Sequence, residues 1–190
     1  MKLLLTGFEK FGDLPLNPSE LVVQALKGQA LHVAVLPTVY DEAGKRIVQL
    51  IDRYLPEAVL MTGVAEKRTE INLERFALNV DDAEKPDNSG AQRTGLHIDP
   101  EGPTARRTKV RLAPIRDALL AKGMPAVISN HAGVFVCNHT YYCALARRTP
   151  ALFVHLPMVS DAWPTERMAE AVQVVIGGMA QQLAPAPTKR

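Results

Sequence analysis

The fold is decided by the opening of the chain, which reads LLLTGFEKFGDLPLNPSELVVQA over residues 3–25. A short apolar run at residues 3–5 predicts a buried strand, and a glycine-bounded loop follows it. Asn17 and Pro18 then open an amphipathic run, the pattern of a capped helix with proline in its first turn. Strand, loop and helix in this order form the repeating unit of a layered α/β protein.

The same alternation of short apolar and longer amphipathic runs continues along the chain. Strands are expected at residues 3–5, 32–36, 58–61, 70–79, 126–129 and 152–156. Helices are expected at residues 18–25, 41–54, 110–122, 138–147 and 164–183. No internal repeat or linker divides the sequence, which therefore predicts a single α/β domain over residues 1–190.

Two segments lack a usable hydrophobic period. Residues 81–103 gather Asp, Pro, Gly, Asn and charged side chains. A loop of that length inside a compact domain is typical of a binding loop or lid, and it can be ordered or mobile. Residues 185–190 predict a frayed tail.

Composition excludes several classes of protein. Of the 190 residues 47% are hydrophobic, and 22 Lys and Arg stand against 20 Asp and Glu, as in an ordinary globular domain. The net charge of +2 is too small for a protein that binds phosphate backbones, so nucleic acid is not an expected partner. The N-terminal apolar run is too short for a signal peptide, and no stretch approaches the roughly 20 apolar residues of a membrane helix. We expect a cytoplasmic protein with no membrane partner.

Cys137 stands where an apolar run leads into the helix expected at residues 138–147. Free backbone amides and the positive end of the helix dipole favour a thiolate there, and the same amides can form an oxyanion hole. The other interpretation is a buried small hydrophobic residue.

His155 and Glu74 complete a possible catalytic set. His155 ends an apolar strand that Pro157 stops, whereas Glu74 shares a strand face with apolar side chains and needs a partner. That partner is Arg68 or Arg75 if the role is structural, and an imidazole if it is functional. With Cys137, these residues would supply a nucleophile, a base and an orienting carboxylate.

Metal binding is the competing use of the histidines. His131, His139, His155 and the Asp81-Asp82 pair are the candidate ligands, but they lack any established ligand spacing. No metal site is predicted.

The loop after the first strand presents two phenylalanines, Phe8 and Phe11. Its glycines have the spacing of a phosphate-binding loop, but the Lys-Ser or Lys-Thr that must follow is missing, so nucleotide binding is not predicted. The two rings either form the wall of a flat apolar pocket or are tucked into the core.

A basic cluster follows the long loop: Arg106, Arg107, Lys109 and Arg111. Two interpretations stay open, a solvated helix start and a surface that holds an acidic or nucleic-acid partner.

Several blocks of sequence occur in a fixed order between Thr6 and His155. They are residues 6–9, 11–12, 17–19, 74–75 with 77 and 79, 82–83, 86–88 with 90, 102–103, 129–130, 132–133, 136–138, and 155 with 157. In these blocks the chain resembles the pyroglutamyl peptidase I family, also called pyrrolidone-carboxylate peptidase, whose members are cysteine peptidases that remove N-terminal pyroglutamate.

The resemblance implies a fold and an assembly. The fold is a single α/β/α sandwich around a twisted, mostly parallel central sheet. No cofactor is implied, and the chain is expected to form a homo-oligomer, a tetramer by the resemblance with a dimer as the smaller alternative.

The resemblance also implies site residues. Cys137 is the nucleophile, His155 the general base and acid, and Glu74 the residue that orients His155, in a reaction through a thioester. The pocket for the pyrrolidone ring is implied to be formed by Phe8, Phe11, Asn17, Phe135 and Val136.

The expected substrates are peptides and proteins with N-terminal pyroglutamate. The ring is flat and neutral, so aromatic faces suit it, whereas a charged amino terminus would be desolvated without a partner. One departure from the family bears on this, because Glu84-Lys85 stands where the family has Arg-Ile near the pocket. The alternative function is therefore hydrolysis of a different small cyclic amide.

Overall fold

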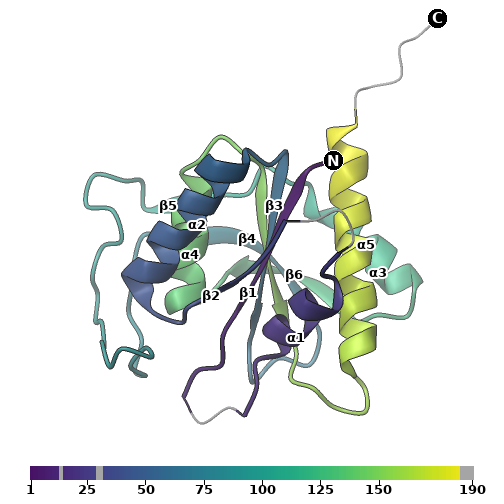
Figure 1. Ribbon diagram of the computed structural model, residues 1–190, viewed down its shortest axis with the longest axis horizontal. Helices are drawn as coiled ribbons and strands as arrows, with labels where there is room; N and C mark the ends of the chain where they lie inside the picture. Colours follow the sequence, from purple (N-terminus) through teal and green to yellow (C-terminus); the bar gives the residue numbers. More distant parts are fainter. Residues whose placement is uncertain (13–14, 29–31, 185–190) are drawn as a thin grey trace, which may run out of the picture.

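The computed structural model describes residues 1–12, 15–28 and 32–184 (Figure 1). The tail expected at residues 185–190 lies outside the described residues.

The centre of the molecule is one twisted sheet. Within the described residues it has seven strands: β1 (Leu3–Phe8), β2 (His32–Leu36), β3 (Ala58–Val64), β4 (Ile71–Leu78), β5 (Ala105–Arg107), β6 (Ala126–His131) and β7 (Ala151–Leu156). They are arranged β2-β1-β3-β7-β4-β5. Phe76 pairs with both Arg107 and His131, so β6 lies on the side of β4 opposite β5.

Most of the neighbouring strands are parallel. β1 is parallel to β2 and β3, β3 to β7, and β4 to β6. Only β4 breaks the pattern, because it is antiparallel to both β7 and β5. Strands β1, β3 and β7 are buried along their whole length, as expected for parallel strands covered on both faces.

Five helices cover the two faces of the sheet in the described part of the chain: α1 (Pro18–Ala25), α2 (Tyr40–Tyr54), α3 (Leu112–Ala121), α4 (Val136–Leu145) and α5 (Thr165–Leu183). Helices α1, α3 and α5 pack on one face, and α2 and α4 on the other (Figure 1). The predicted α/β/α sandwich with a mostly parallel sheet is confirmed.

The predicted helices are all present, with ends within about two residues of those expected. The cap expected at Asn17 is formed, since its side-chain oxygen accepts a hydrogen bond from the backbone N–H of Ser19 at 3.0 Å. Helix α4 begins at Val136 rather than at Asn138, so Cys137 lies inside its first turn.

Strand β5 was not predicted. Its three residues are two arginines after an alanine, which carry no alternation of apolar and polar side chains. The predicted strand 58–61 was also too short, because β3 continues to Val64.

The segment between β4 and β5 is tied to the rest of the molecule at several points. Asp81 and Leu96 form an isolated bridge across it. Farther along, the Asp87 carboxylate accepts a hydrogen bond from the backbone N–H of Tyr40 at 3.1 Å, at the start of α2.

No helix in the described ranges has the length and the apolar character needed to cross a membrane.

Candidate active site

Cys137 lies in the first turn of α4, at the carboxyl end of the parallel strands. Its helix begins after Phe135, and no side chain caps that start by a hydrogen bond. The first backbone amides of a helix have no intrahelical acceptor, so they carry partial positive charge that can act on an anion beside Cys137.

Gly63 is a neighbour of both Cys137 and His155. In the parallel ladder between β3 and β7, Gly63 pairs with His155. A Cβ on Gly63 would lie 3.0 Å from Cys137 Sγ and 2.9 Å from the Phe153 ring. The thiol and this ring therefore occupy the space that any larger side chain would need.

Glu74 reaches His155 because β4 runs antiparallel to β7. Glu74 pairs with Phe153, and residues two apart on a strand share a face, so His155 is the diagonal neighbour of Glu74. His155 Nδ1 lies 2.8 Å from Glu74 Oε1. Glu74 is fully buried and His155 is 4% exposed. An ionised carboxylate can only accept, so Nδ1 is the donor in this hydrogen bond and Nε2 is the ring nitrogen that Glu74 does not engage.

Arg68 also contacts Glu74, with Nη1 donating to Oε1 at 2.6 Å. The structure thus gives Glu74 both of the partners considered from sequence, an imidazole and an arginine. Arg75 is not one of them, since it donates to the side-chain oxygen of Asn130 at 2.9 Å. Within the described residues, the second carboxylate oxygen of Glu74 has no hydrogen-bond partner.

The surroundings of Cys137 disfavour a charged sulfur. Burial and, to a smaller extent, the nearby Glu74 carboxylate raise the pKa of the Cys137 thiol to about 12. Arg68 lowers this pKa, but by less than Glu74 raises it. Without substrate, Cys137 is therefore a thiol at neutral pH, and not the standing thiolate that its place at a helix start suggested.

A small cavity opens beside the thiol. It has a volume of about 30 Å³ and is lined by Phe8, Phe11, Asn17, Thr38, Gly63, Val64, Phe135 and Cys137. The rings of Phe11 and Phe135 lie 5.9 Å apart, centre to centre. Most of this lining is apolar, as in sites that hold a small flat ligand.

Four of the five expected pocket residues line this cavity, and Val136 does not. The Val136 side chain is fully buried in the core between the sheet and helices α2 and α4. Because α4 begins at Val136, neighbouring side chains point to different sides of the helix, and Val136 turns inward while Cys137 faces the cavity.

Asn17 borders the cavity, but its side chain is engaged elsewhere. Its nitrogen donates to the backbone carbonyl of Glu9 at 3.0 Å, and its oxygen caps α1. It therefore ties the chain directly after Phe8, the last residue of β1, to the start of α1.

Sequence reasoning missed Thr38, Gly63 and Val64. Gly63 and Val64 lie on the part of β3 beyond the predicted strand, and the small Gly63 within an apolar run was the available signal of a close approach. Thr38 follows β2 and has no distinguishing pattern.

The altered residues Glu84 and Lys85 do not line the cavity. Both are exposed, and Lys85 Nζ lies 3.2 Å from Glu66 Oε1 at the surface. A different ring specificity has no basis in their position.

No three or more His, Cys, Asp or Glu side chains gather as a metal site in the described ranges. His139 and Asp81, both considered as ligands from sequence, contact each other instead, with Nδ1 at 2.9 Å from Oδ2.

Comparison with known proteins agrees with this arrangement. Residues 1–175 match the family model described as pyroglutamyl peptidase. The pyrrolidone-carboxylate peptidase of Pseudomonas fluorescens is 36% identical, over 93% of this chain and 88% of the relative. That of Cupriavidus taiwanensis is 38% identical, over 98% and 93%.

Solved structures of the same kind are also similar. Pyrrolidone carboxyl peptidase from the hyperthermophile Pyrococcus furiosus superposes with a TM-score of 0.91 at 30% identity, over 97% of this chain and 100% of that one. Pyroglutamyl peptidase I of Bacillus amyloliquefaciens gives 0.89 at 29% identity, over 97% and 99%. This chain therefore belongs to the pyroglutamyl peptidase family of cysteine peptidases.

Proposed function

We propose that this chain removes an N-terminal pyroglutamyl residue from peptides, with Cys137 as nucleophile, His155 as base and acid, and Glu74 as the group that orients His155. The observation that carries the proposal is the buried 2.8 Å bond between His155 and Glu74, because His155 pairs with Gly63, which lines the aromatic cavity together with Cys137.

Recognition begins with the lactam ring. The ring enters between the phenylalanine side chains of the cavity and carries no charge that must be desolvated. A protonated amino terminus in the same place would lose its hydration without an anionic partner, because no carboxylate lines the cavity in the described chain. The cavity of about 30 Å³ is close to the space of one water molecule, so Phe11 and Phe135, both half-buried, must part to admit the ring.

The acylation step follows from the order of the side chains. His155 Nε2 takes the proton of the Cys137 thiol as Sγ attacks the carbonyl carbon of the pyroglutamyl residue. The first-turn amides of α4 stabilise the oxyanion, and Glu74 stabilises the imidazolium. When the carbon–nitrogen bond breaks, the imidazolium gives its proton to the leaving amine, and a thioester remains on Cys137.

Deacylation repeats this chemistry with water. His155 Nε2 takes a proton from the water that attacks the thioester, and the same proton returns to the departing sulfur. Free pyroglutamate leaves, and Cys137 is a thiol again.

The raised pKa of Cys137 fits this sequence of events. A buried thiol of pKa about 12 is not ionised at rest, so its proton must be removed by His155 during the attack. General acid–base help of this kind contributes roughly 10²–10⁴-fold to a rate.

The test is hydrolysis of a pyroglutamyl anilide, with the prolyl anilide as the charged counterpart. We expect the wild type to hydrolyse only the pyroglutamyl substrate, and Cys137→Ala to lose at least about 10³-fold in kcat. Cys143→Ala is the matched control and should keep its activity, since Cys143 lies about 1.7 turns farther along α4. Equal rates on the two anilides, or an active Cys137→Ala protein, would contradict the proposal.

The alternative function, hydrolysis of a different small cyclic amide, is tested with the anilide of a six-membered lactam. Faster turnover of this analogue than of the five-membered ring would favour a different cyclic amide.

A further inference from the structure

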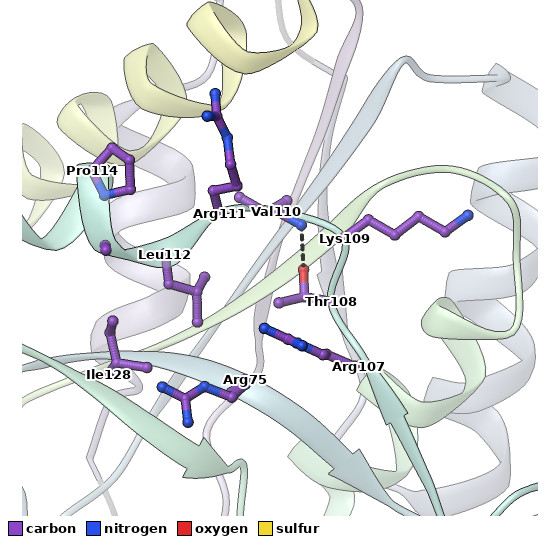
Figure 2. Close-up of a pocket in the computed structure, with 10 residues that line it drawn as sticks. Arg75, Arg107, Thr108, Lys109, Val110, Arg111, Leu112, Pro114 and Ile128 are labelled. Atoms are coloured by element: carbon purple, nitrogen blue, oxygen red, sulfur yellow. Dashed lines mark hydrogen bonds between the residues drawn. The ribbon is translucent and has the colours of Figure 1, made fainter.

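A second, larger cavity lies between strands β4 and β5 and the start of α3 (Figure 2). Its volume is about 560 Å³, which is within the range of small-molecule sites. None of the residues that line it also lines the active-site cavity.

Two arginines line this cavity: Arg75 is half-buried, whereas Arg107 is exposed and its guanidinium lies 6.0 Å from the centre of the Phe76 ring. Arg75 comes from β4 and Arg107 from β5, and Figure 2 shows both side chains extending in the same direction below Leu112. The remaining two cations, Lys109 and Arg111, extend away from the centre and form the rim. Three members of the basic cluster seen in the sequence therefore share one wall with Arg75.

No carboxylate neutralises these four charges in the described part of the chain. The partner of Arg75 is the neutral amide of Asn130, and Lys109 donates to the backbone carbonyl of Arg148 at 3.3 Å. None of the four takes part in an ion pair among the described residues.

The fourth member of the sequence cluster behaves differently. Arg106 Nη2 lies 2.9 Å from Asp99 Oδ2, and the Arg106 guanidinium lies over the Tyr142 ring. Within the described residues, the fold thus provides a carboxylate for Arg106 and none for Arg75 and Arg107. An anion between these two side chains would therefore meet positive charge that no carboxylate offsets.

The start of α3 adds to the positive potential. Helix α3 has ten residues, and its first residues, Leu112 to Pro114, line the cavity. No side chain caps this helix, and its first turn holds no acidic residue. Pro114 has no N–H, so Leu112 and Ala113 supply the free amides that favour an anion in the same space.

We propose that this cavity binds a compact anion that carries phosphate groups, such as inorganic pyrophosphate or the phosphate chain of a nucleotide. The planar guanidinium fork matches phosphate oxygens in pairs, and two forks from neighbouring strands suit an anion with more than one phosphate. The site is separate from the peptidase chemistry and stands or falls independently of it.

Pyrophosphate and a nucleotide both offer phosphate groups, but only the nucleotide also carries a base. Val110, Leu112 and Ile128 form an apolar wall of the cavity. A nucleotide could place its base against this wall, whereas pyrophosphate has no apolar group to place there. Calorimetry with pyrophosphate and with ADP, which has the same number of phosphates, distinguishes them without divalent metal: tighter binding of ADP assigns a role to the apolar wall, and equal binding assigns the site to the phosphates alone.

The test of the site itself is calorimetric titration of the whole chain with pyrophosphate in about 0.15 M salt, a concentration that screens weak surface attraction. We expect one anion per chain, and an affinity at least about 10-fold weaker for each guanidinium removed in Arg75→Gln and Arg107→Gln. The matched control is the pair Arg46→Gln and Arg53→Gln on α2, which removes the same charge from the opposite face. It should bind as the wild type does.

A double lysine variant controls for misfolding. The protein with both Arg75→Lys and Arg107→Lys keeps both charges but loses the planar guanidinium groups. We expect its affinity for pyrophosphate to lie between that of the wild type and that of the protein with both Arg75→Gln and Arg107→Gln. Absence of binding by the wild type, several anions per chain, or an equal loss in the α2 control would overturn the proposal.

Discussion

Cys137 illustrates how the surroundings of one residue can oppose its position. The first turn of a helix favours a thiolate, yet burial and the Glu74 carboxylate together raise the pKa of Cys137 to about 12. The balance keeps the sulfur protonated, so in the proposed mechanism the thiol must be activated by His155.

The alkylation rate of Cys137 tests this balance. With Cys143→Ala protein, so that only one thiol remains, we expect the rate with iodoacetamide to rise about tenfold per pH unit from pH 7 to 9, because only the thiolate reacts. The rate is followed by mass spectrometry of the labelled peptide. A rate that is constant over this interval would mean a thiolate already formed at neutral pH.

Arg68 is the residue whose removal should disturb His155 through Glu74. In Arg68→Leu the buried carboxylate of Glu74 loses its hydrogen bond with the guanidinium and keeps the one with His155. We expect kcat/KM for the pyroglutamyl anilide to fall about tenfold, because a carboxylate held by one partner fixes the imidazole less firmly. The neighbouring exposed Lys67→Leu removes the same charge and should leave kcat/KM unchanged. An unchanged kcat/KM in both variants would show that Arg68 has no such role.

At this scale much of the site could be predicted from residue type and position. Cys137, His155 and Glu74 each looked unusual in its own segment, and the structure brings their segments together. Gly63 could not be assigned from sequence, because its importance lies in the approach of Cys137 and Phe153 from two other elements.

Among the elements, α4 and the segment after β4 are joined by a buried charge network. Asp81 Oδ2 lies 2.9 Å from both His139 Nδ1 and Arg93 Nη1, and Arg93 also pairs with Asp41 of α2 at 2.8 Å. Burial alone would lower the pKa of His139, but hydrogen bonds with Asp81 and Cys143 outweigh it and raise the value to about 9. A charged His139 thus holds this segment against the helices.

The network should make stability depend on pH. The pKa of His139 is raised above its ordinary value of about 6.5, so its contribution is fully present below that pH and is lost as pH rises toward 9. The loss should amount to a few kcal/mol in the free energy of unfolding. Urea unfolding at pH 6 and pH 9 measures it.

The matched variants are His139→Gln and His97→Gln, the second an exposed histidine in the segment between β4 and β5 that also carries Asp81 and Arg93. We expect the difference between the two pH values to shrink in His139→Gln and to stay in His97→Gln. The same pH dependence in all three proteins would show that His139 is not its source.

Elements with local signals were predicted well, and those without were not. Asn17, Pro18 and the hydrophobic period defined α1, whereas β5 has only three residues and exists because β4 offers an edge for it to pair with. The sequence did not predict the carboxyl end of β3 for a similar reason. Thr62 and Gly63 weaken the apolar pattern there, but pairing with β7 continues through them.

For the whole molecule, the topology decides where chemistry is possible. Strands β1, β3 and β7 are parallel, and their carboxyl ends carry Phe8, Gly63 and His155, the usual edge for a site in an open α/β sheet. The antiparallel β4 then adds Glu74 from the opposite direction. Sequence alone could assign the layers, but not that one reversed strand supplies the carboxylate that contacts His155. The expected assembly of several copies stays a prediction.

The measurement that tests the central claim most directly is labelling with pyroglutamyl chloromethyl ketone, with the prolyl reagent as its charged counterpart. The label should attach to Cys137 once per chain, abolish hydrolysis of the pyroglutamyl anilide, and be slowed by free pyroglutamate, while the prolyl reagent reacts far more slowly. Labelling at Cys143, or equal reaction with both reagents, would contradict a nucleophile at Cys137 beside a pocket for the neutral ring.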